Sequence, residues 1–89
     1  MDIKEVQGVL KKILVDSLFI EIPEDEITEE DSIGTDLGLD SVGFVELATI
    51  IREKYKIEIK EQELTSGAFA TIKSLSEFIV ARVSEKIAI

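Results

Sequence analysis

Apolar side chains recur at intervals of three and four residues in three separate stretches of this chain. Because an α-helix repeats every 3.6 residues, this spacing places them on one helical face. It predicts amphipathic helices at about residues 2–19, 41–55 and 72–87. The predicted core faces comprise Ile3, Val6, Leu10, Ile13, Leu14 and Leu18 in the first stretch, Phe44, Leu47, Ala48, Ile51 and Tyr55 in the second, and Ile72, Leu75, Ile79, Val83 and Ile87 in the third.

The connections between these stretches differ in length and pattern. Residues 20–40 contain Pro23 and show no sustained period, which predicts a long first loop. Its apolar residues should pin it against the helices, and they are Ile27, Ile33, Leu37 and Leu39. Residues 56–60 alternate like a strand with nothing to pair with, so we expect an extended linker that buries Ile57 and Ile59. Residues 61–69 have room for only a short helix.

These elements predict a single all-α domain over residues 1–89, namely a small four-helix bundle with a long first loop and a short third helix. An 89-residue chain of 45% hydrophobic content has enough apolar surface for one thin core. Two capping residues compete for the start of the last helix, Thr71 and Ser74.

The negative charge lies almost entirely in the first half of the chain. Residues 1–40 carry 12 acidic and three basic side chains, whereas residues 41–89 carry seven of each. Residues 21–31 alone hold seven acids and no base. This distribution argues against nucleic-acid binding and favours either basic protein partners, approached by electrostatic steering, or simply a solvated loop.

The composition excludes several classes of active site. The chain has no Cys and no His, so it lacks disulfides, thiolate or imidazole metal sites and the Ser-His-Asp machinery. A calcium-binding EF-hand aligned on Gly34 would need an oxygen ligand at its fifth position and finds Ile33, and a serine-hydrolase elbow would need glycine where Leu39 stands. We therefore expect no metal site and no enzymatic activity.

Neither end of the chain has the pattern of a targeting or membrane segment. The first residues lack the features of a signal peptide, and no apolar run is long enough to span a membrane. We expect a cytoplasmic protein that does not enter a membrane. Met1 and the compact ends favour a free-standing protein over a piece of a larger synthase.

The candidate functional residue is Ser41, which follows Asp40 where the acidic segment ends and the second helix begins. A helix N-terminus presents unpaired backbone N–H groups and a positive dipole end, so a phosphate attached to Ser41 would be well placed. The alternative is that the Asp-Ser pair only caps the helix. Gly43 in the first turn lowers helix propensity, and one hypothesis is that it leaves room for a bulky group on Ser41.

Three runs of residues together resemble an acyl carrier protein of the phosphopantetheine-binding superfamily. They are residues 36–42 (DLGLDSV), 45–47 (VEL) and 69–75 (FATIKSL). The resemblance covers nearly the whole chain and implies the same four-helix architecture. It also implies that 4′-phosphopantetheine from coenzyme A is attached at Ser41, next to Asp40. The protein would then be a non-catalytic carrier that holds acyl groups as thioesters on this arm.

The resemblance further implies the partners and the surface that meets them. The partners would be a phosphopantetheinyl transferase (holo-carrier synthase) and acyltransferase, ketosynthase or acyl-activating enzymes, and the carrier would be a monomer. The second helix would be the recognition surface, and a helical wheel leaves four of its residues on the outer face: Val42, Glu46, Thr49 and Glu53.

Three positions depart from the pattern of fatty-acid carriers. Gly43 stands where an acid is usual, Thr49 where a large apolar residue is usual, and Arg52 makes residues 41–55 neutral overall. We therefore favour specialised metabolism such as polyketide biosynthesis. The alternatives are a carrier of primary fatty-acid biosynthesis, a peptidyl or aminoacyl carrier, or a helical protein-interaction module without cofactor.

Overall fold

The computed structural model describes residues 2–88, with side chains for residues 2–86, so the predicted core position of Ile87 lies outside the described side chains. Its three main helices are α1 (Ile3–Lys12), α2 (Ser41–Tyr55) and α3 (Ile72–Ala88). Shorter helical turns are η1 (Ile13–Ser17), η2 (Glu24–Glu26), η3 (Glu61–Thr65) and η4 (Gly67–Phe69). Within residues 2–88 the β structure is limited to one isolated bridge, Ser32 to Thr71. The predicted all-α class is confirmed.

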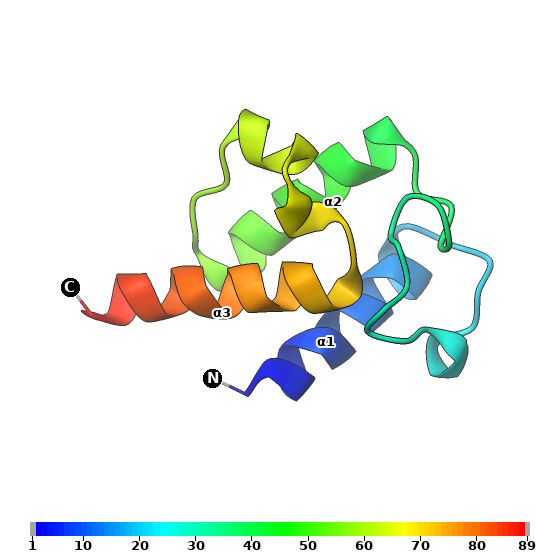
Figure 1. Cartoon of the computed structure of the whole chain (residues 1–89), viewed down its shortest axis with the longest axis horizontal. Helices are drawn as coiled ribbons and strands as arrows, with labels where there is room; N and C mark the ends of the chain where they lie inside the picture. The colour runs from blue at the N-terminus through cyan, green and yellow to red at the C-terminus, as the bar shows by residue number, and fades with distance from the viewer. Residues whose placement is uncertain (1, 89) are drawn as a thin grey trace.

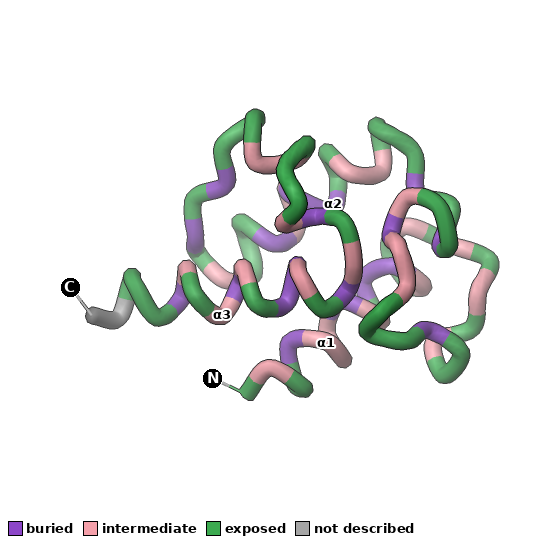
Figure 2. The backbone as a smooth tube through the Cα atoms, viewed as in Figure 1, coloured by how far each residue is buried: buried purple, intermediate pink, exposed green. Residues whose placement is uncertain are grey.

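The long loop between α1 and α2 occupies one end of the molecule, and the C-terminus lies at the opposite end (Figure 1). Buried residues lie on all three main helices and on the loop (Figure 2). Along the predicted helical stretches, the most deeply buried apolar side chains are Val6, Leu10 and Leu14, Leu47 and Ile51, and Ile72, Leu75 and Ile79. All eight belong to the faces predicted from the sequence. In the described part of the chain, no helix is long and apolar enough to span a membrane.

The first helix changes its geometry before it ends. Asp2 caps α1 by accepting a hydrogen bond from the Lys4 N–H at 3.0 Å. The α-helix stops at Lys12, earlier than the predicted end near residue 19, and continues as the π-helical turn η1. There the Leu18 N–H donates to the Ile13 carbonyl at 3.0 Å. Phe19 then adopts a left-handed conformation, with φ of 57°, and ends the helical path.

The loop of residues 20–40 is fixed by side-chain burial and by backbone hydrogen bonds. Its four predicted pins are buried, which confirms that expectation: Ile27, Ile33, Leu37 and Leu39. Two loop carbonyls cap the start of α3, because Ile72 N–H donates to Asp31 at 3.3 Å and Lys73 N–H to Glu29 at 2.8 Å. Backbone groups at a helix start otherwise lack partners, so these contacts tie the loop and α3 together.

The segment predicted as a short helix at residues 61–69 consists instead of two 3-10 turns, η3 and η4, separated by Ser66. The Ser66 hydroxyl donates to the Glu63 carbonyl at 2.7 Å and accepts from the Ala68 N–H at 3.3 Å. A serine that pairs with nearby backbone groups competes with a continuous helix. Ile57 and Ile59 in the preceding linker are buried, as expected. The next helix, α3, uses Thr71 as its cap: Thr71 Oγ1 accepts from the Ser74 N–H at 3.0 Å.

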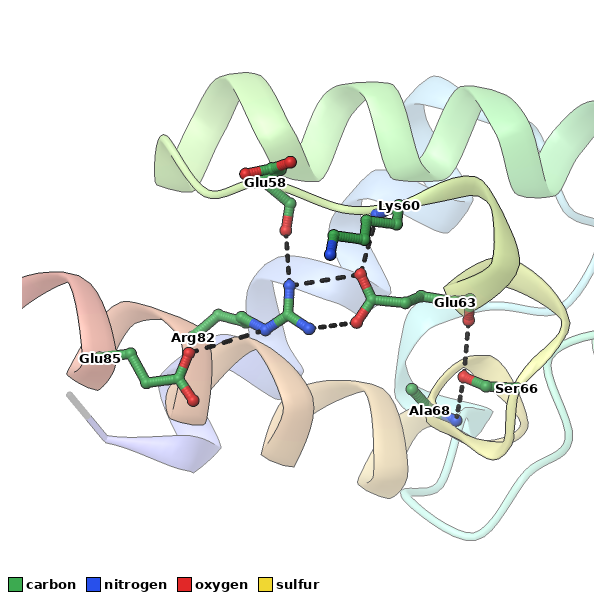
Figure 3. Close-up of polar contacts among 7 residues, drawn as sticks. All are labelled: Glu58, Lys60, Glu63, Ser66, Ala68, Arg82 and Glu85. Atoms are coloured by element: carbon green, nitrogen blue, oxygen red, sulfur yellow. Dashed lines mark hydrogen bonds and ion pairs between the residues drawn. The ribbon is translucent and has the colours of Figure 1, made fainter.

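Arg82 of α3 holds the segment between α2 and η4 against the bundle. Arg82 Nη1 donates to the Glu58 carbonyl at 2.9 Å, while its other terminal nitrogen pairs with the Glu63 carboxylate (Figure 3). The Arg82 guanidinium also lies 4.7 Å from the ring centroid of Phe78. Four residues further on, Lys86 Nζ donates to the Lys56 carbonyl at 2.9 Å. The chain between α2 and η4 is therefore held by α3.

Candidate functional site

Ser41 is the first residue of α2, and Asp40 is its N-cap. The Asp40 side chain accepts a hydrogen bond from the Gly43 N–H at 2.8 Å. Both residues are exposed, and the Ser41 hydroxyl makes no hydrogen bond within the described residues. The sequence left two interpretations open, a phosphate attached to Ser41 or an Asp-Ser pair that only caps the helix. In the structure Asp40 performs the capping. The Ser41 hydroxyl remains available for chemistry.

The first turn of α2 suits a negative group on Ser41. It contains no acidic side chain, while Arg52 and Lys54 stand near the opposite end of the helix. The backbone N–H groups of a helix start and the positive end of its dipole stabilise an attached phosphate. A phosphate ester on the Ser41 oxygen is therefore compatible with the residues around it.

The chain enters this turn through two buried leucines. Leu37 and Leu39 lie on either side of Gly38, whose φ of 76° is in the left-handed region that favours glycine. A Cβ on Gly43 would lie 2.5 Å from Leu39 Cδ1 and 2.7 Å from Leu39 Cγ. The space over Gly43 is therefore filled by Leu39. Packing explains this glycine, in place of the hypothesis that it makes room for a group on Ser41.

The four residues expected on the outer face of α2 do not all lie open. Val42 is 65% exposed, and Glu46 and Glu53 are exposed as expected. Thr49 is only partly exposed, which corrects its predicted position. Its hydroxyl donates to the Val45 carbonyl at 3.0 Å and accepts from Arg52 Nη2 at 3.3 Å.

Sequence reasoning missed two exposed apolar residues near Ser41. Val45 is 55% exposed, although it is not one of the four residues predicted for the outer face of α2. Phe19 is 79% exposed, although the periodicity had assigned it only to the end of the first helix. No pattern in the sequence indicates that Phe19 leaves the helix, because a bulky residue rarely adopts positive φ.

A hollow of about 540 Å³ opens beside the start of α2. One wall comes from residues 18–22 at the end of the first helix, one from residues 35–40 and one from Val42, Gly43 and Glu46 of α2. Four acids line it and no lysine or arginine does: Glu21, Asp36, Asp40 and Glu46. Ser41 stands between two of the lining residues, Asp40 and Val42.

Two acids of the loop accept hydrogen bonds from nearby backbone groups. The Asp31 carboxylate accepts from the Thr28 N–H at 2.9 Å, and the Asp36 carboxylate from the Ser32 N–H at 2.8 Å. Over the residues that the structure describes, no group of three or more potential ligands is arranged to hold a metal ion. These carboxylates stabilise turns.

Three comparisons relate this geometry to known proteins. A family model described as "Phosphopantetheine attachment site" matches residues 9–79. Acyl carrier proteins from three Clostridium perfringens strains, among them SM101 and ATCC 13124, are 37% identical over 70 residues, covering 79% of this chain and 87% of the relative. A solved structure of an acyl carrier protein from Enterococcus faecalis superimposes with a TM-score of 0.75 at 23% identity, covering 92% of this chain and 99% of that one.

Proposed function

Because this chain belongs to the acyl carrier proteins, a family defined by its phosphopantetheine attachment site, we propose that Ser41 is the residue that carries the prosthetic group. Members of this family are non-catalytic carriers of phosphopantetheine-linked acyl groups. Membership therefore removes the alternative of a helical interaction module without cofactor. The observation that carries the assignment to Ser41 is its exposed hydroxyl, left free at the start of α2 while Asp40 caps the helix.

Attachment uses Ser41 as the nucleophile. Its Oγ forms a new phosphate ester bond, the pyrophosphate bond of coenzyme A breaks, and adenosine 3′,5′-bisphosphate leaves. The serine proton passes to a base of the phosphopantetheinyl transferase, since the chain has no His. The positive end of the α2 dipole would favour the negative charge of the resulting phosphodiester.

The arm supplies a thiol, which holds the acyl group as a thioester and which a chain without Cys cannot supply. The role of the protein itself is to anchor and present that arm. Tethering raises the effective concentration of the cargo at any enzyme that binds the carrier. The partners we propose are a phosphopantetheinyl transferase and acyltransferase, ketosynthase or acyl-activating enzymes.

These partners meet the carrier on the outer face of α2, at Val42, Glu46, Thr49 and Glu53. The carrier must leave each enzyme after a single step, which favours a small, partly charged surface with fast association. Two observations support this face. Val42 and Glu46 are exposed one residue and five residues after Ser41, and the Arg52 contact orients Thr49 at its edge.

For the pathway we propose specialised metabolism, such as polyketide biosynthesis. The support is the neutral balance of α2, where Arg52 and Lys54 offset Glu46 and Glu53, together with Gly43 in the first turn. A carrier of primary fatty-acid biosynthesis and a peptidyl or aminoacyl carrier are the alternatives. The test compares the acylated protein with a fatty-acid carrier as substrates of a primary fatty-acid ketosynthase. An equal kcat/KM contradicts the specialised role.

The assignment of Ser41 is tested by incubation with coenzyme A and a broad-specificity phosphopantetheinyl transferase, followed by intact mass spectrometry. We expect one phosphopantetheine adduct on the wild-type protein and none on Ser41→Ala. An adduct of the same size on Ser41→Ala contradicts the assignment. Circular dichroism of both proteins verifies that the substitution has left the helices intact.

A further inference from the structure

Phe19 is a solvent-exposed aromatic residue with an unfavourable backbone conformation. Its side chain is 79% exposed, and its φ of 57° lies in the left-handed region, where a bulky side chain is strained. The conformation ends the first helix: the next N–H, that of Ile20, donates to the Leu14 carbonyl at 3.1 Å. Glycine or asparagine is the usual residue at such a helix end. A strained, exposed aromatic residue is thus not explained by stability.

Phe19 and the residues around it form one wall of the hollow beside α2. Val42, itself 65% exposed, belongs to the wall formed by α2. The hollow therefore combines two exposed apolar side chains with an acidic lining that has no basic residue. A protein segment that presents lysine or arginine side chains around an apolar patch would complement this hollow. Charge complementarity determines which partner binds and in which orientation.

The position of the hollow selects among basic partners. An enzyme that acts on the distant thiol of the arm can bind at some distance from Ser41. The transferase must bring its active site to the Ser41 oxygen itself, so its contact surface has to include the neighbours of Ser41. Asp40 and Val42 are these neighbours, and both line the hollow.

We propose that this hollow is the docking groove for the phosphopantetheinyl transferase, with Phe19 as the apolar anchor and Glu21 as a charge contact. The inference rests on the proposed function of Ser41 and extends the recognition surface from α2 to the end of the first helix. Aromatic side chains at interfaces supply large contact area for little conformational entropy, which makes them frequent anchors.

Phe19→Gly separates docking from folding because it changes them in opposite directions. Glycine adopts the left-handed conformation of this position without strain, so the variant should melt at the same temperature as the wild type or higher. Loss of the ring should raise the KM of holo-acyl-carrier-protein synthase for the apo-protein about five- to tenfold, the size of effect expected for an interface residue that costs about 1 kcal/mol when truncated, with kcat unchanged. Phe19→Leu keeps an apolar side chain and should retain part of the affinity.

Charge is tested with a matched pair. Glu21→Gln and Glu30→Gln each remove one negative charge from an exposed position, but only Glu21 lines the hollow. We expect about a two- to threefold higher KM for Glu21→Gln than for Glu30→Gln, an effect of the size of one exposed charge pair, and it should shrink as salt is added.

The outcomes distinguish this inference from the function on which it rests. Modification of wild type and Phe19→Gly with the same KM overturns the docking groove and leaves Ser41 as the attachment site. A lower melting temperature for Phe19→Gly also overturns it, because Phe19 would then serve the fold. No adduct on the wild-type protein contradicts the proposed function, and the inference fails with it.

Discussion

Leu39 packs directly against Gly43 and occupies the space that a side chain at position 43 would need. The Cδ1 atom of Leu39 lies 2.5 Å from where a Cβ on Gly43 would stand, and Leu39 is only 8% exposed. The loop thus closes against the first turn of α2, two residues from Ser41. The geometry around Ser41 depends on this contact as well as on the Asp40 cap.

Gly43→Ala should therefore destabilise the protein although alanine is the better helix former. Overpacking a buried site costs about 1–3 kcal/mol. The gain in helix propensity returns at most about 1 kcal/mol. We expect a net loss on the order of 1 kcal/mol in the free energy of unfolding, measured by urea denaturation.

Gly8→Ala is the matched control for this change. Gly8 lies within α1, and an added Cβ there would have nothing within 4 Å. This variant should gain up to about 1 kcal/mol. Equal stabilisation of the two variants would show that Leu39 does not fill the space over Gly43.

Removal of the Asp40 cap gives a second prediction. Asp40→Ala leaves the Gly43 N–H without its acceptor and should lower the free energy of unfolding by about 1 kcal/mol. Asp40→Asn keeps an oxygen in the same place and should stay within about 0.5 kcal/mol of the wild type. Thermal melts of both variants decide between them. An asparagine variant as unstable as the alanine variant would mean that the charge of Asp40, rather than the cap, stabilises α2.

Glu63 should matter far more to stability than Glu85, although both pair with Arg82. Glu63 also accepts from the Lys60 N–H at 2.8 Å, and its side chain is 18% exposed. The Glu85 side chain is 72% exposed and lies 3.8 Å from Arg82 Nε. We expect Glu63→Gln to cost about 1–2 kcal/mol and Glu85→Gln less than about 0.5 kcal/mol in urea denaturation. Similar losses of stability for Glu63→Gln and Glu85→Gln would contradict a special role of Glu63 in holding the chain between α2 and η4.

The same carboxylate gives stability a defined pH dependence. The hydrogen bond from the Lys60 N–H, assisted by Arg82, lowers the pKa of Glu63 below its ordinary value. A lowered pKa means that the folded protein favours the charged form, so the contribution is complete above the unfolded-state pKa. It is lost as the pH falls through the folded-state pKa. The stability difference between wild type and Glu63→Gln should therefore shrink across this acidic range, and a constant difference would contradict the assignment.

The sequence predicted best what depends on burial. Helical spacing identified the inward faces of α1, α2 and α3, and the isolated apolar residues of the loop correctly marked its pins. Burial of an apolar side chain is strongly favourable wherever it occurs, so the pattern alone reports it. The Asp-Ser pair likewise located the start of α2, because a cap and an exposed hydroxyl are local features.

Features that depend on hydrogen-bond geometry were not predictable in this way. Periodicity cannot distinguish the π-turn after Lys12 from a continued α-helix, because both keep the apolar face inward. Ser66 interrupts residues 61–69 through its own side-chain hydrogen bonds, and the Thr49 hydroxyl donates to the Val45 carbonyl of the same helix. Arg82 and Glu63 stand 19 positions apart, and no local pattern connects them. The conformation of Phe19 was not predicted, because its positive φ is one that a bulky residue rarely adopts.

The central claim is that the phosphopantetheine arm is attached to the free hydroxyl at the start of α2. Fragmentation mass spectrometry of the modified protein after trypsin digestion tests it most directly. Residues 13–52 form one tryptic peptide, and it contains three serines: Ser17, Ser32 and Ser41. We expect the whole adduct on Ser41, with Ser17 and Ser32 unmodified. An adduct on either of those serines, or on a different peptide, would contradict it.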